Sequence, residues 1–174
     1  MTSTMRFDKW ENSLGQPYGS VLQVVQGVLS TPVTFTSSGS WVSVGINATI
    51  TPKFIESKIL VELNVCVGSN GSTSYDSGFG LFRNGTQIAL PTSPGSRMQS
   101  ILPFADRVQS QYEMVTANNS FLDAPASIVA LTYDLRAYSS GNTNAKYINR
   151  TGADSDGLGD NRMISTITLT EIAQ

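Results

Sequence analysis

Tyr147-Ile-Asn-Arg150 and Met163-Ile-Ser-Thr-Ile-Thr-Leu-Thr-Glu-Ile172 are the two stretches that decide the fold expected of this sequence. A loop dense in Asn, Asp, Gly and Arg separates them. The second stretch intersperses apolar residues with Ser, Thr and Glu, which is typical of a half-buried β-strand. Because a strand this late in the sequence must pair with strands formed earlier, we expect it to belong to the main sheet system.

The rest of the sequence from Val21 onward also has the period-two pattern or the short apolar runs of strands. In the best of them Ile59, Val61 and Leu63 point to one face, and Leu60 and Glu62 to the other. The dipeptide at 84–85, Asn-Gly, predicts a type I′ hairpin turn because both of its residues tolerate positive φ. The predicted strands cover residues 21–29, 33–36, 41–50, 58–67, 78–83, 86–90, 111–116, 127–138, 145–150 and 163–172. With no amphipathic helix and no internal repeat, the pattern predicts an all-β protein, a jelly-roll β-sandwich of about eight to ten antiparallel strands.

Composition excludes several classes of partner. The 174 residues suffice for one domain, and their formal net charge is -2. Charged residues make up only 14%, so the polar surface comes from Ser, Thr, Asn and Gln. There is no basic footprint for nucleic acid. No segment is apolar enough for membrane insertion, and no signal peptide is recognisable, which predicts synthesis in the cytoplasm.

The sequence also argues against an enzyme. It contains no His, which removes the commonest general base and every Ser–His or Cys–His arrangement. Cys66 is the single cysteine, and its apolar strand predicts a buried thiol. Sugar hydrolysis needs two carboxylates close together, and the sequence does not pair any of the scattered acids, which are Asp106, Glu113, Asp123 and Asp134. We therefore predict no catalytic residue and no cofactor.

Three acids in the glycine-rich loop, Asp154, Asp156 and Asp160, are candidate calcium ligands because oxygen ligands at alternating positions suit this cation. The loop is too short for an EF-hand and lacks its terminal Glu. We therefore predict no metal, and expect these acids to accept hydrogen bonds from Arg150 and Arg162.

Residues 1–20 differ from the domain formed by residues 21–174, because they mix charges with isolated aromatics and have no sustained period. One interpretation is a tail that lies on its own domain. The other is an attachment arm that anchors the subunit by burying Phe7, Trp10 and Tyr18 in a neighbour.

Several motifs, taken in order, resemble the tumour-necrosis-factor-like (complement-like) jelly-roll domains of phage tail and capsid fibre proteins. They are Trp41-Val-Ser-Val44, residues 46–52, Ser57-Lys-Ile-Leu-Val61, Phe82-Arg-Asn-Gly85, residues 124–136, and the two stretches quoted first. The resemblance covers residues 21–174, and the start at Met5 to Trp10 also resembles the anchoring starts of such fibres. Long collar and shaft regions are missing, which favours a short fibre, a knob or a capsid decoration protein.

The resemblance implies a virion protein that forms a homotrimer, contacts other capsid or tail proteins, and touches the host surface, including its glycans, through outer loops. The candidate glycan-contacting residues are Tyr75, Tyr112, Tyr138 and Tyr147, whereas Trp41 is expected in the core. The alternative function is a free carbohydrate-binding module without virion anchoring. A polysaccharide-degrading enzyme is a third hypothesis, and the missing His and unplaced carboxylates argue against it.

Overall fold

The computed structural model describes residues 11, 19–36, 39–70, 77–92, 95–104, 108, 110–139 and 145–174. These residues form eleven strands: β1 (Val21–Leu29), β2 (Val33–Phe35), β3 (Val42–Ile50), β4 (Lys58–Ser69), β5 (Ser77–Arg83), β6 (Thr86–Ile88), β7 (Leu102–Pro103), β8 (Met114–Asp123), β9 (Leu131–Ser139), β10 (Lys146–Ile148) and β11 (Ser165–Ile172). Within the described ranges, no helix has the length and hydropathy needed to cross a bilayer.

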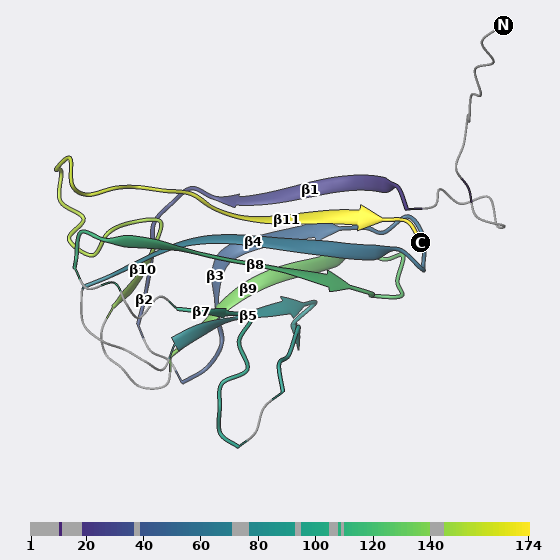
Figure 1. Cartoon of the computed structure of the whole chain (residues 1–174), viewed down its shortest axis with the longest axis horizontal. Helices are drawn as coiled ribbons and strands as arrows, with labels where there is room; N and C mark the ends of the chain where they lie inside the picture. The colour runs from purple at the N-terminus through teal and green to yellow at the C-terminus, as the bar shows by residue number, and fades with distance from the viewer. Residues whose placement is uncertain are drawn as a thin grey trace, which may run out of the picture.

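The first sheet has four lanes, where a lane is one strand or two strands that lie end to end in the same row of the sheet. The lanes run from β1 at the top of Figure 1 down to β8. β8 pairs with one whole edge of β4, so β11 and β10 lie end to end along its other edge. β1 pairs with β11 and β2 with β10, and they form the outermost lane. The late strand β11 is therefore held between β1 and β4, as expected.

The second sheet also has four lanes, in the order β3, β9, β5 and then β6 with β7. β9 occupies one whole edge of β5, and β6 and β7 share the other. Numbering the lanes in chain order makes the sheets 1-8-3-6 and 2-7-4-5, with every pairing antiparallel. This is the strand order of a jelly roll, which confirms the predicted fold class. The strand count exceeds the expected range because three of the lanes are interrupted.

Most predicted strands are found, and the largest difference is β8. The sequence pattern indicated residues 111–116, whereas the strand runs from Met114 to Asp123. The segment Asn118-Asn119-Ser120 has the composition of a turn, but unbroken pairing from Gly68↔Met114 to Ile59↔Asp123 satisfies its backbone. Cross-strand pairing thus overrides the local preference.

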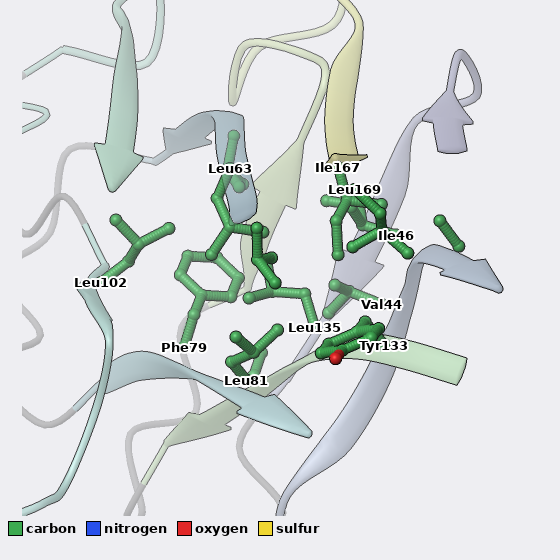
Figure 2. Close-up of a cluster of buried hydrophobic side chains, with 14 of the residues drawn as sticks. Val44, Ile46, Leu63, Phe79, Leu81, Leu102, Tyr133, Leu135, Ile167 and Leu169 are labelled. Carbon is green, nitrogen blue, oxygen red and sulfur yellow. The ribbon is translucent and has the colours of Figure 1, made fainter. Parts of the chain in front are cut away.

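The core lies between the sheets (Figure 2). In that view Leu63, Ile167 and Leu169 reach it from the first sheet, and Phe79 and Leu135 from the second. The predicted inward face of β4 is confirmed, since all five of its apolar residues are buried: Ile59, Val61, Leu63, Val65 and Val67. Burying each such side chain contributes about 1.5–3 kcal/mol.

One side of the sandwich is closed by direct backbone contact between the sheets. A Cβ added at Gly27 of β1 would lie 1.9 Å from the carbonyl oxygen of Asn47 in β3. Only glycine permits this approach, so β1 packs directly against the neighbouring sheet.

Candidate functional site

Asn149, from the first quoted stretch, lies at the point where two lanes of the first sheet are interrupted. Its side chain is fully buried and its φ is 64°, in the left-handed region. The side-chain Nδ2 donates to the carbonyl oxygens of Leu29 (2.7 Å) and Thr31 (3.3 Å). The backbone N–H donates to the carbonyl of Cys66 (2.9 Å). Asn149 therefore connects three lanes and directs the following loop out of the sheet.

The three candidate metal ligands in that loop have separate partners. Asp154 lies between two arginines, 3.1 Å from Arg150 and 2.6 Å from Arg162. Asp160 accepts hydrogen bonds from the Thr151 hydroxyl (2.6 Å) and the Ser155 amide (3.0 Å). The hydroxyl of Ser155, followed by that of Thr151, lowers the pKa of Asp160.

Asp156, the third candidate, is exposed. Among the described residues, no three His, Cys, Asp or Glu side chains are grouped as a metal site would need. The expected bonds from Arg150 and Arg162 are present at Asp154, whereas Asp160 is bonded within its own turn.

The tyrosines proposed for glycan contact differ in their surroundings. Tyr112 is exposed. Tyr138 packs against Trp41, with ring centroids 5.4 Å apart. Tyr147 is buried beneath the guanidinium of Arg150, which lies 3.7 Å from the ring centroid. Tyr75 lies outside the described residues, as do the anchoring candidates Phe7, Trp10 and Tyr18.

The three scattered acids that the structure describes each have separate partners. Asp123 points toward the hydroxyl of Tyr133, a fully buried residue of β9. Asp134 follows Tyr133 in the strand, so it lies on the opposite face of that sheet, where it accepts from Ser43 (2.7 Å) and Arg136 (2.8 Å). Glu113 accepts from the backbone of Ser110 (3.3 Å). Asp106 lies outside the described residues.

A polar cluster that sequence reasoning missed joins the two sheets. Asp123 of β8 accepts hydrogen bonds from Arg83 of β5 (2.6 Å) and from the Tyr133 hydroxyl (2.7 Å). Burial and the bond to Asp123 raise the pKa of Tyr133 far above its ordinary value. These residues are far apart in sequence, so no local pattern signals their meeting. Asp123 and Tyr133 are buried between the sheets and the Arg83 side chain is 28% exposed, so we assign the cluster a structural role.

The outer face of the first sheet carries two shallow hollows that meet at Asn64, and we call them the outer trough. The first is lined by Glu62, Leu63, Asn64, Asn118, Asn119, Ser120, Thr166 and Thr168. The second is lined by Ser30, Asn64, Cys66, Thr116, Arg162, Met163 and Ile164. The side chains of Glu62, Asn64 and Asn118 are exposed, and no hydrogen bond joins them to the rest of the described chain. The trough therefore offers free amide, hydroxyl and carboxylate groups to a ligand.

Comparisons with known proteins find similarity in structure alone. No family model matches the sequence, and no curated protein matches it. Three similar solved structures come from infectious bursal disease virus: those of the Gx strain (8% identity, TM-score 0.35), the Gt strain (8%, 0.37) and the VP2 subviral particle (8%, 0.32). Each match covers 97% of this chain and 45 to 46% of the viral chain. This chain thus spans less than half the length of the structures that it matches.

Proposed function

We propose that this protein is a non-enzymatic structural subunit of a phage virion, a short fibre, knob or capsid decoration protein. The observation that carries the proposal is the 1-8-3-6 and 2-7-4-5 lane order. Jelly rolls with this order build viral capsid domains and lectins. The low charge of the chain, 14% of residues, supports a particle surface built from Ser, Thr, Asn and Gln.

The subunit assembles as a homotrimer attached to other virion proteins through residues 1–20. Exposed apolar side chains support burial against another subunit, since Val21, Val24 and Val28 of β1 are each more than half exposed. β1 follows directly after the arm, so an interface on this strand is continuous with one made by Phe7, Trp10 and Tyr18. Each large apolar anchor contributes about 1.5–3 kcal/mol when buried.

Incorporation into particles tests this function. Full-length protein and a variant lacking residues 1–18 are expressed with an epitope tag during infection, and purified particles are probed by immunogold labelling. We expect label on particles for the full-length protein alone, while the truncated protein remains folded by circular dichroism. Light scattering of the full-length protein should give about three times 18.7 kDa, or a multiple of that mass where trimers associate further. Absence of full-length protein from particles would overturn the proposal.

The outer trough favours a second candidate, a carbohydrate-binding module, because its free amide and hydroxyl groups suit a neutral polyhydroxylated ligand. A glycan array probed with wild type and with a Glu62→Gln, Asn64→Ala variant tests it. The control is Asn47→Ala, an exposed amide of β3 in the other sheet. Glycan binding lost in the trough variant alone, and independent of residues 1–18, would support this candidate.

A further inference from the structure

The two sheets present four edge lanes, β1 with β2, β8, β3, and β6 with β7. Backbone groups on an exposed edge pair readily with another chain. Proteins normally prevent this with charges, prolines, bulges or very short strands.

Three of these edges carry such protection. On β1, Lys53 Nζ donates to the carbonyl of Leu22 (3.0 Å), and Gly27 packs against the β3 backbone. β3 has a register shift between Ser43 and Ile46, with Gly45 at a φ of 81°. β6 and β7 are only three and two residues long, and β7 ends in Pro103.

β8 has the fewest of these protections, because its single charge is Asp123 at its C-terminal end. It is ten residues long, and its pairing with β4 is continuous from end to end. The sequence MVTANNSFLD contains no proline or glycine and no charge before Asp123. In the described part of the chain β8 pairs with β4 alone. A hollow beside β8 is lined by Ala89, Leu90, Pro91, Ser100, Ile101, Asn119, Ser120 and Phe121, and the Asn119 side chain donates to the carbonyl of Ile101 there (2.7 Å).

We propose that β8 pairs antiparallel with β8 of a second copy of this chain, across a two-fold axis at Asn118. The first sheets of the two copies then form one continuous sheet. A two-fold contact requires a strand that is complementary to itself, with each residue facing its own counterpart about the axis. This contact is separate from the trimer interface proposed above.

The side chains of β8 select this register. With the axis at Asn118, Met114 lies opposite Leu122, Val115 opposite Phe121, and Thr116 opposite Ser120. Apolar residues thus meet at both ends and polar residues at the centre, as favourable cross-strand pairs require. Val115 and Leu122, now 40% and 48% exposed, become covered. With the axis at Asn118, Asp123 lies opposite Glu113, one residue beyond the end of the partner's strand, whereas moving the axis to Asn119 or Ser120 places Asp123 opposite Val115 or Ala117 within that strand.

Cysteine cross-linking tests both the contact and its register, in a Cys66→Ser background that removes the native thiol. Asn118→Cys should form a covalent dimer under mild oxidation, because opposed residues of antiparallel strands have Cα atoms about 4.5–5.5 Å apart, within disulfide range. Thr116→Cys and Ser120→Cys should each remain monomeric on non-reducing gels, but cross-link when the two proteins are mixed. The matched control is Asn47→Cys, on an exposed strand position of the other sheet.

The proposal would be overturned if Asn118→Cys cross-linked no faster than the Asn47→Cys control. It would also be overturned if Ser120→Cys alone formed a covalent dimer as fast as Asn118→Cys is expected to. A charge variant gives an independent measurement. Asn118→Lys places two like charges at the axis and should weaken self-association at least tenfold in sedimentation equilibrium, whereas Asn47→Lys should not. If these tests fail but the protein still enters particles, the virion role stands and the β8 contact is wrong. If the cross-links form but the protein does not enter particles, the β8 contact stands and the virion role is wrong.

Discussion

Ser165 donates a 2.6 Å hydrogen bond from its hydroxyl to the side-chain oxygen of Asn149, and both residues are fully buried. The same hydroxyl accepts from the backbone N–H of Cys66 (2.9 Å). The pair therefore connects β4 with β10 and β11 at the gap between the latter two strands, which share one lane. It fixes both ends of the loop that carries Asp154 and Asp160.

Asn149→Ala should destabilise the protein by about 2–4 kcal/mol, because it leaves buried carbonyls unpaired and places alanine in the left-handed region. Asn149→Gly is the matched control, since glycine accepts the φ of 64° but also lacks the amide. We expect the glycine variant to lose less stability in urea unfolding. Equal stability of the alanine variant and wild type would contradict the role of Asn149.

The cluster of Asp123, Arg83 and Tyr133 should be essential for stability. Asp123→Ala leaves the Tyr133 hydroxyl buried without its acceptor and Arg83 without its counter-charge, so we expect a loss of about 3–5 kcal/mol. Tyr133→Phe removes one bond to a carboxylate and should cost about 1.5–3 kcal/mol. Asp134→Ala, on the outer face, serves as control and should cost about 0–1 kcal/mol. Thermal unfolding of the three variants checks this order.

Ionisation of the buried Glu171 carboxyl should make the stability of the fold depend on pH. Burial alone would raise its pKa, but hydrogen bonds from Gln23 Nε2 (2.6 Å) and the Lys53 amide (2.7 Å) lower the pKa below the ordinary value of 4.5. The stabilisation is therefore complete above that ordinary value and is lost as pH falls through the lower folded-state pKa.

Glu171→Gln should reduce stability at neutral pH and flatten its decline between about pH 5 and pH 3. Urea midpoints of wild type and variant, measured across this range, provide the check. Parallel pH profiles would show that Glu171 is not the titrating group.

Gly27→Ala should destabilise the sandwich by about 1–3 kcal/mol, because the new Cβ would collide with the backbone carbonyl of Asn47. A backbone group cannot move aside as the end of a flexible side chain could. Gly159→Ala is the control, since a Cβ there meets nothing within 4 Å. Chemical denaturation should separate the two variants clearly. A Gly27→Ala protein as stable as the control would contradict the close approach of the two strands.

The acidic loop should be insensitive to chelators, because Asp154 and Asp160 already have protein partners. Arg162→Ala should cost no more than about 1 kcal/mol, since its side chain is 56% exposed. Arg150→Ala should cost more, because Arg150 also stacks on Tyr147 and donates to Thr34 (3.1 Å). Melting temperatures with and without chelator provide the measurement, and a large decrease for wild type would reveal a bound cation.

The sequence by itself determined the features that depend on neighbouring residues. Alternation in the segment from Ile59 to Val67 decides which side chains are buried, because successive side chains of a strand point to opposite faces. Asn84 and Gly85 form the predicted hairpin turn, with φ values of 48° and 85°, since these residue types tolerate the left-handed region. Cys66 is buried, as its apolar strand predicted.

Only the tertiary structure decided which polar residues meet. Asp123 reaches Arg83 across 40 positions of sequence, and Asn149 reaches Leu29 across 120. Such contacts depend on the register and order of whole strands, which alternation leaves open because a shift of two residues preserves the buried face. The composition of Asn118-Asn119-Ser120 likewise predicts a turn, whereas pairing with β4 holds this segment in an extended edge strand.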